Sequence, residues 1–187
     1  MNSDSTLKEF LSVRFTLGEA ADSIQNAPEK SQLVPELFFQ MQDKDAQIAF
    51  RSAWYLEMLV FQRPSLFTPY LKEFLTHYLS YQNLSVLRHI TKILIFIQGS
   101  NSPIIWKTIY EDSLRTHKEE FVELHFSWLI DPDLPVAIRA NCMDILYAFG
   151  KVESWIHQEL KLSLIHIMEE PSPALFSRAK KIYKLLK

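Results

Sequence analysis

The chain contains very little glycine, with only Gly18, Gly99 and Gly150 among its 187 residues. Sheet-rich folds and glycine-looped enzymes need more backbone positions with positive φ than these three supply. Three isolated glycines also cannot form a glycine-rich phosphate-binding loop. The abundant Leu, Ile, Phe, Lys and Glu indicate instead a chain that is mostly helical.

Cysteine, net charge and long apolar runs are scarce as well. The single Cys142 cannot form an internal disulfide, which fits a reducing compartment. With 20 basic and 22 acidic residues the formal charge is −2, so nucleic acid is a disfavoured partner. Residues 1–5 lack the regions of a signal peptide, and the most apolar run, residues 93–97, is too short to span a bilayer. These features predict a soluble, cytoplasmic protein with no membrane partner.

Prolines divide the chain into helical segments. They fall mostly at the starts of apolar-periodic stretches, where a missing backbone N–H costs nothing. The i, i+3, i+4 spacing of apolar residues between them predicts helices and no strand. The predicted helices cover residues 4–15, 17–26, 31–42, 45–62, 65–81, 83–98, 103–115, 118–130, 135–149, 152–169 and 173–186. Residues 48–61 have few polar positions, which predicts a helix packed from two sides, as in stacked helix pairs.

Four segments of the chain align on one arginine each. They are residues 45–51, 83–88, 133–139 and 172–178, which open with Asp45, Asn83, Asp133 and Ser172 and end at Arg51, Arg88, Arg139 and Arg178. Each opening residue can cap a helix, and each arginine leads into an apolar helix. The arginines are 37, 51 and 39 residues apart, within or near the period of two-helix repeats. The middle spacing is too long, and the excess maps to an insertion near residues 98–115.

A capping Asp, then a small or β-branched residue, an Arg and an apolar helix resembles the second helix of a HEAT repeat. The resemblance covers about residues 31–187, and the chain as a whole is similar to short bacterial HEAT-like proteins without an assigned activity. It implies an all-α fold, a right-handed α-α superhelix of the HEAT/armadillo-like solenoid class with about five helical pairs, in a single domain over residues 1–187. In HEAT-like repeats such arginines pair with the capping Asp of a neighbouring repeat, which implies Asp45 and Asp133 as partners.

Candidate catalytic and metal-binding groups are few. No two of the six histidines have the i, i+4 spacing of a helical zinc site, and there is no His-Glu-x-x-His motif. Cys142 lies in the middle of a predicted helix among apolar neighbours, so we interpret it as a small buried hydrophobe and not as a nucleophile. The sequence therefore predicts a protein that is not an enzyme and binds no metal or other cofactor.

Aromatic residues form 13% of the chain. Trp54, Trp128 and Trp155 fall on apolar stripes and are predicted to lie in the core. Trp106 and Tyr110 are one turn apart inside the insertion. They form either an exposed patch that anchors a partner or the packing face of the inserted helix.

A short stack of helix pairs has a concave face built from equivalent positions of its second helices. Counted from the arginines, that face contains Arg51, Tyr55, Arg88, Lys92, Arg139 and Met143. Mixed charge with aromatic and methionine contacts suits a protein or peptide better than DNA, so we expect a non-enzymatic interaction scaffold. The alternatives are a nucleic-acid-binding or catalytic platform of the HEAT-like DNA glycosylase type, and a module that forms a homodimer. The basic last helix, with Arg178, Lys180, Lys181, Lys184 and Lys187, is either a polar end cap or a site for an acidic partner.

Overall fold

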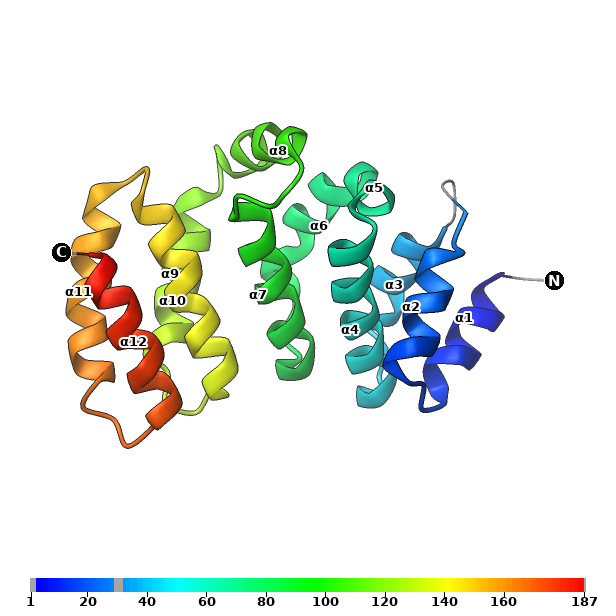
Figure 1. Ribbon diagram of the computed structural model, residues 1–187, viewed down its shortest axis with the longest axis horizontal. Coiled ribbons are helices and arrows are strands. Elements are labelled where there is room, and N and C mark those ends of the chain that lie inside the picture. Colours follow the sequence, from blue (N-terminus) through cyan, green and yellow to red (C-terminus); the bar gives the residue numbers. More distant parts are fainter. Residues whose placement is uncertain (1–2, 29–31, 187) are drawn as a thin grey trace.

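The computed structural model describes residues 3–28 and 32–186, and every secondary-structure element in these ranges is a helix (Figure 1). The elements are α1 (Ser3–Ser12), α2 (Leu17–Gln25), α3 (Leu33–Gln40), α4 (Ala46–Gln62), α5 (Pro64–Phe67), η1 (Thr68–Tyr70), α6 (Leu71–His77), η2 (Tyr78–Ser80), α7 (Leu84–Gln98), α8 (Ile104–Leu114), α9 (Lys118–Ile130), α10 (Val136–Gly150), α11 (Ser154–Ile167) and α12 (Pro173–Leu185). Two expectations, a helix start at residue 31 and the basic Lys187, lie outside the described residues.

The helices stack in two rows. In Figure 1, α4, α7, α10 and α12 follow one another along the front, and α3, α6 and α9 lie behind them. The contacts agree with this arrangement, because α4 packs on α7, α7 on α10 and α10 on α12, while α3 packs on α4 and α9 on α10. Helix α1 lies at one end of the array and α12 at the other. In the described part of the chain, no helix combines the length and apolarity that crossing a bilayer requires.

Helix α4 has the two-sided packing that its sequence predicts. Ala53 and every residue from Tyr55 to Val60 are buried, which covers all directions around the helix axis. Leu56 and Leu59 have no exposed surface, and neither do Ile90 and Ile93 of the neighbouring α7. The core therefore runs along the array between the rows, with each helix pair covered by the next.

Side-chain caps start α4, α7 and α12 where the sequence predicts. The Asp45 carboxylate accepts hydrogen bonds from the backbone N–H of Gln47 and Ile48, and Ser172 Oγ accepts one from the Leu175 N–H. Asn83 caps α7 in the same way as Asp45 caps α4. The predicted cap at Asp133 is wrong, because α10 begins after Pro135 and has no side-chain cap. Proline suits the start of a helix without a cap, since its fixed φ is already helical.

The helix predicted over residues 65–81 is instead a chain of short pieces, from α5 through η1 and α6 to η2. Pro69 explains the first break, because proline has no N–H to donate to the carbonyl one turn earlier and its ring crowds that turn. The Pro64 carbonyl accepts both the backbone N–H and the hydroxyl of Thr68, the latter at 2.9 Å, so the turn before the break stays closed. The bend that results creates the surface against which α8 packs.

Candidate functional site

The four aligned arginines all lie in second helices, but they make different contacts. Arg51 in α4 donates to the Leu11 and Ser12 carbonyls at 2.9 and 2.8 Å, at the C-terminal end of α1. Unsatisfied carbonyls and the negative end of the helix dipole make this a favourable place for a cation. Arg51 is therefore a C-terminal cap for another helix, and its predicted pairing with a capping aspartate is wrong.

Arg139 repeats this device inside the molecule. Its Nε donates to the Leu129 carbonyl at 2.9 Å, near the end of α9, and its two terminal nitrogens hold both Glu170 oxygens at 2.7 and 2.5 Å. The hydrogen bonds from Arg139 lower the pKa of Glu170. Arg178 instead pairs with Asp144 at 3.2 Å, so the expected partner Asp133 is not used. These contacts hold helices together and leave Arg139 only 3% exposed.

The predicted concave face is not one accessible surface. Tyr55, Arg139 and Met143 are all buried, so they cannot contact a partner directly. The Tyr55 hydroxyl donates to Ser23 Oγ at 2.9 Å, and burial raises the pKa of this phenol. The position four residues after each arginine turns into the core in α4 and α10, where neighbouring helices cover it. Only in α7 does it reach the surface, at Lys92.

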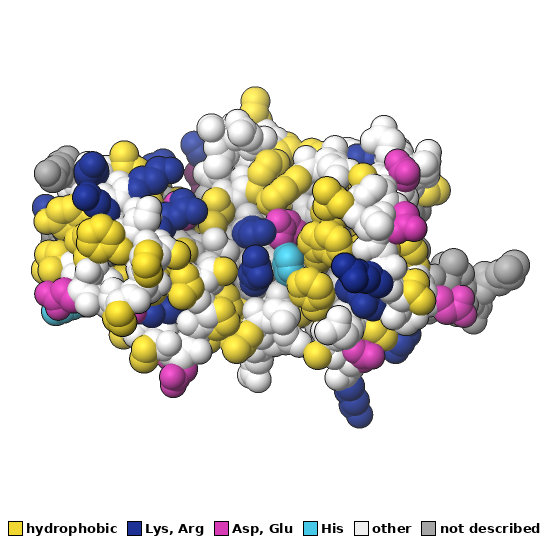
Figure 2. All heavy atoms as spheres, turned by 60° about the horizontal axis from the view of Figure 1, so that its bottom comes forward, with side chains coloured by type: hydrophobic (Ala, Val, Ile, Leu, Met, Phe, Trp, Pro, Cys, Tyr) yellow, Lys and Arg dark blue, Asp and Glu magenta, His cyan; other side chains and the backbone are white. Residues whose placement is uncertain are grey.

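What remains accessible on this side is a small group of residues on α4 and α7, which we call the Arg88 surface: Phe50, Trp54, Arg88 and Lys92. Arg88 is exposed, the Lys92 side chain is 38% exposed, and both aromatic rings are half-buried. Phe50 and Trp54 stack with ring centroids 6.4 Å apart, and Trp54 continues onto Phe15 at 5.1 Å. Figure 2 shows basic side chains in the middle of this face, beside a histidine, a carboxylate and a group of hydrophobic side chains.

A buried ion cluster lies directly beneath the Arg88 surface. Glu57 of α4 accepts a hydrogen bond from His89 Nδ1 at 2.5 Å and one from Lys92 Nζ at 3.0 Å, both from α7. Burial opposes ionisation of Glu57, but the hydrogen bonds from His89 and Lys92 outweigh it and lower the pKa of this carboxyl. The cluster fixes the position of α7 against α4 and so the place of Lys92 on the surface.

The α7–α10 junction is also held by a polar contact. The Asn141 amide of α10 donates to the Thr91 hydroxyl at 2.8 Å and reaches the Arg88 carbonyl at 3.4 Å. Both ends of the turn that carries Arg88 are therefore tied to neighbouring helices. The Arg88 surface is displayed on a rigid part of the array.

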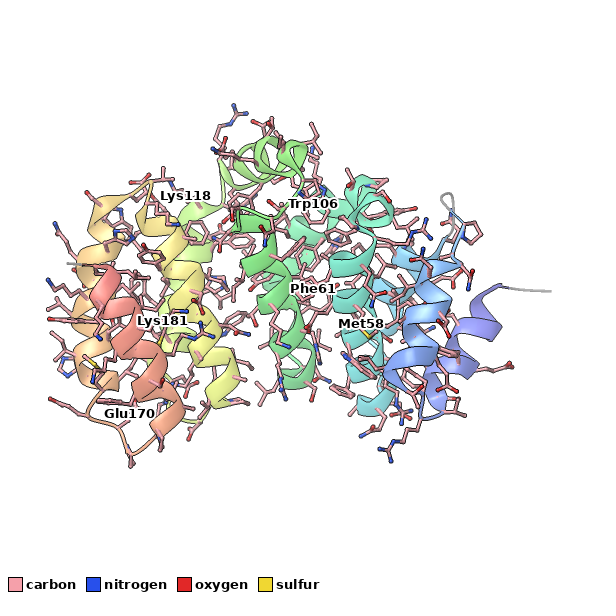
Figure 3. The ribbon with its side chains drawn as sticks, viewed as in Figure 1. Met58, Phe61, Trp106, Lys118, Glu170 and Lys181 are labelled. Atoms are coloured by element: carbon pink, nitrogen blue, oxygen red, sulfur yellow. The ribbon has the colours of Figure 1, made fainter. Side chains whose placement is uncertain are left out.

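Helix α8 lies across the edge of the array, outside the two rows (Figure 1). Trp106 is fully buried, and its Nε1 donates to Thr68 Oγ1 at 2.7 Å while its ring packs against Phe67 and Phe96. Figure 3 shows Trp106 between α8 and the bend that follows α5. An exposed patch of Trp106 and Tyr110 is therefore wrong, because these rings anchor α8 to the array.

The apolar side chains that α8 does expose are aliphatic. Ile104 is 91% exposed and Ile105 is 55% exposed. Further along the same edge, Val152 is 78% exposed and Trp155 is 47% exposed, so the prediction that Trp155 lies in the core is wrong. Trp155 misled the sequence interpretation because α11 is a terminal helix that is covered mainly on one side.

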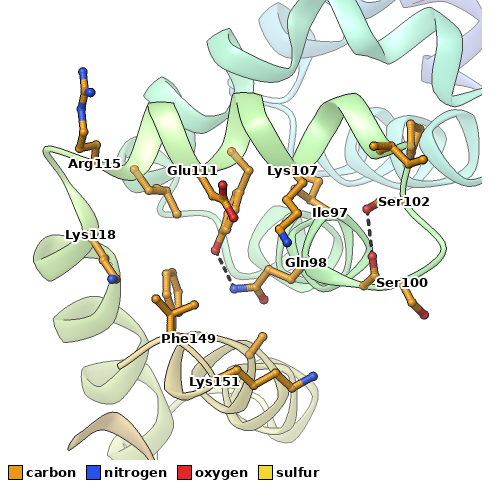
Figure 4. Close-up of a pocket in the computed structure, with 17 residues that line it drawn as sticks. Ile97, Gln98, Ser100, Ser102, Lys107, Glu111, Arg115, Lys118, Phe149 and Lys151 are labelled. Carbon is orange, nitrogen blue, oxygen red and sulfur yellow. Dashed lines mark hydrogen bonds between the residues drawn. The ribbon is translucent and has the colours of Figure 1, made fainter. Parts of the chain in front are cut away.

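A cavity of about 770 Å³ lies between α8 and the ends of α7 and α10 (Figure 4). Ile97, Leu114 and Phe149 form its apolar floor, and all three are buried. The Gln98 amide faces this space and donates to Tyr110 Oη at 2.7 Å, and burial raises the pKa of the Tyr110 phenol well above its usual value. No sequence pattern predicted this cavity, although residues 98–115, where an insertion was expected, contain the segment that covers it.

The other candidate reactive groups offer little chemistry. Burial strongly raises the pKa of the Cys142 thiol, which keeps it protonated and supports its interpretation as a small core residue. In residues 3–28 and 32–186, no three His, Cys, Asp or Glu side chains come together in a way that could hold a metal ion.

The stacked rows of helices define a class of protein, the α-solenoid, in which repeated helix pairs build an extended surface. The family model of the HEAT repeat domain matches residues 7–186, and the chain belongs to this family. This confirms the expected all-α helical solenoid. Comparisons with curated proteins and with solved structures gave no significant match. HEAT repeat domains are generally non-catalytic helical scaffolds that mediate protein interactions.

Proposed function

We propose that the chain is a non-enzymatic scaffold that binds a protein or peptide partner on the Arg88 surface, the accessible part of its concave helical face. The observation that carries this proposal is that α7 exposes Arg88 next in sequence to His89, whose ring lies 5.3 Å from Phe50, the ring that stacks on Trp54. Arginine and aromatic side chains dominate the binding energy of protein interfaces, because they offer large contact areas together with directional hydrogen bonds.

The chemistry of the surface indicates the kind of partner. Arg88 and Lys92 favour carboxylates, and the half-buried rings of Phe50 and Trp54 favour apolar side chains. A partner helix with acidic residues beside an apolar row would meet both demands. We also propose a cytoplasmic location for this interaction, which the single, buried Cys142 supports.

The proposal predicts that Arg88→Glu removes partner binding without unfolding the protein. Arg88 is exposed and its side chain makes no ion pair in the described part of the chain, so its reversal breaks no internal contact. A like charge placed against an acidic partner costs several kcal/mol, so recovery of the partner is expected to fall by about tenfold or more. The measurement is affinity capture from a lysate of the source organism, quantified by mass spectrometry against the unmodified protein.

Lys72→Glu, a reversal at an exposed lysine of α6, is the matched control and is expected to retain the partner. Reversing Lys92 is not a clean test, because it would place a second carboxylate beside Glu57, which Lys92 now contacts. Identical capture profiles for wild type and Arg88→Glu would exclude this surface. Salt-dependent retention on immobilised DNA would favour the nucleic-acid alternative, and a concentration-dependent dimer in light scattering would favour self-association.

A further inference from the structure

The cavity under α8 is separate from the Arg88 surface and has the form of a ligand site. Its volume of about 770 Å³ falls within the range of about 300–1,000 Å³ that small-molecule sites occupy. Helices α7, α8 and α10 line it from three directions, and the loop at residues 99–103 closes one end. A concave site buries more of a small ligand than a flat protein interface does.

The charges on the cavity wall are unbalanced. Four cations line it, Lys107, Arg115, Lys118 and Lys151, but only one carboxylate, Glu111. Lys118 is paired with Glu153 at 2.5 Å, and Lys151 lies over the Tyr147 ring. In the part of the chain that the structure describes, Lys107 makes no ion pair, and in Figure 4 its amine points into the cavity toward Gln98.

Gln98 provides a second, independent indication of a ligand. Its amide nitrogen is used by Tyr110, and its Oε1 is buried without a hydrogen-bond partner in the protein. Turning the amide by half a rotation lets Oε1 accept the Tyr110 O–H and leaves the N–H₂ group as the buried polar group without a partner in the protein. An anionic oxygen between Gln98 and Lys107 would then accept hydrogen bonds from both.

The floor of the cavity is apolar, in contrast to its basic wall. It is formed by the aliphatic and aromatic side chains of Ile97, Leu114 and Phe149. A ligand that satisfies the whole cavity must therefore carry an anionic head group and an apolar body. A fully polar anion would leave the floor uncovered, and a neutral hydrocarbon would leave Lys107 and Gln98 without a partner.

From these features we propose that the cavity binds a small amphipathic carboxylate, with its head group at Lys107 and Gln98 and its apolar body on the Ile97–Leu114–Phe149 floor. The site lies on a different surface from the partner-binding residues, and its occupancy does not depend on Arg88.

The test uses dodecanoate as the probe, titrated into the full chain in a calorimeter below its micellar concentration. We expect one saturable site with a dissociation constant at or below about 100 µM. Dodecanol, which has the same chain without the charge, should bind at least about tenfold more weakly, because the charge-assisted hydrogen bonds are lost. Lack of saturation below about 1 mM, or equal affinity for the acid and the alcohol, overturns the proposal.

Variants locate the site. Lys107→Glu should weaken dodecanoate binding by about tenfold or more, and Lys107→Arg should retain it. Ala148→Leu, which adds carbon to the cavity wall, should also weaken binding, and thermal melting shows whether each variant is folded. Lys72→Glu, which makes the same charge change outside the cavity, should leave affinity unchanged. If Lys72→Glu weakens binding as much as Lys107→Glu, binding is non-specific ion exchange and the proposal fails.

Discussion

The side chain of His125 is completely buried between the two halves of the array. Its Nδ1 lies 2.6 Å from the Phe121 carbonyl, and its Nε2 lies 2.9 Å from Tyr78 Oη. Burial raises the pKa of Tyr78 well above its usual value, so this phenol keeps its proton and donates it to Nε2. The imidazole is thus held neutral, with Nδ1–H donating to the carbonyl.

Burial lowers the pKa of His125 to about 4, from 6.5 in an exposed histidine. The unfolded chain therefore binds the extra proton first as the pH falls, and stability is lost between these two values. We expect His125 to contribute a loss on the order of 2 kcal/mol between about pH 7 and about pH 5. Urea unfolding of wild type and His125→Gln at both pH values checks this, and a pH dependence that is unchanged in the variant would contradict it.

The arginines show why side-chain roles were harder to predict than side-chain positions. Their places in the second helices could be found from spacing, because the helix period repeats locally. Their partners could not be found, because Arg51 and Arg139 bind backbone carbonyls of helices elsewhere in the chain. A carbonyl has no residue-type signal, so nothing in the sequence distinguishes a capping arginine from an exposed one such as Arg88.

Among the elements, α10 and α11 are in close contact at Gly150. A Cβ atom at Gly150 would overlap the ring of His157, which stacks on Tyr147 and lies 2.9 Å from the Tyr147 carbonyl oxygen. Gly18, in the first turn of α2, has open space, with no atom nearer than 3.9 Å to a Cβ built there. The two glycines therefore make a matched pair for substitution.

We expect Gly150→Ala to destabilise the protein by about 1–3 kcal/mol, because the added methyl group must displace the His157 ring. Gly18→Ala should be neutral or stabilise by up to about 1 kcal/mol, since alanine is the better helix former. Denaturant unfolding of both variants measures the two signs. If Gly150→Ala instead raised the free energy of unfolding and Gly18→Ala lowered it, the α10–α11 contact would be looser than in the structure.

The boundaries of elements were predictable where a side chain caps the helix, as at Asp45 and Asn83. The start of α10 beside Pro135 was also predicted, although its capping residue was not, and the interruption at Pro69 was missed. The same residue type has opposite effects at the first turn and in the interior, and the apolar pattern alone does not tell which applies.

At the scale of the whole molecule, the all-helical architecture followed from composition and period, but the accessible surface did not. Met143 and Lys92 occupy corresponding positions by spacing, yet one is fully buried and the other reaches solvent. Exposure depends on which helices cover each turn, and the spacing of residues along one helix does not tell this. The cavity under α8 is formed by three segments that lie apart in the sequence, so no local sequence pattern predicts it.

A stack of helix pairs is stabilised by contacts between neighbours, so its ends have fewer of them. Helix α7 packs mainly on α4, α8 and α10, whereas α12 packs mainly on α10 and α11. We predict that backbone amides of α4, α7 and α10 exchange slowest with solvent deuterium and that those of α1 and α12 exchange first. Hydrogen exchange with mass spectrometry measures this order, and uniform protection along the chain would show that the array opens as one unit.

The anchoring of α8 by Trp106 has a mechanical consequence. Hydrogen bonds attach α8 to the bend after α5 at one side and to Gln98 of α7 at the other, so α8 links these two parts of the array. Bending of the helical array would move α10 relative to α8 and change the volume of the cavity between them. A molecule bound in that cavity would resist this change and so stiffen the array.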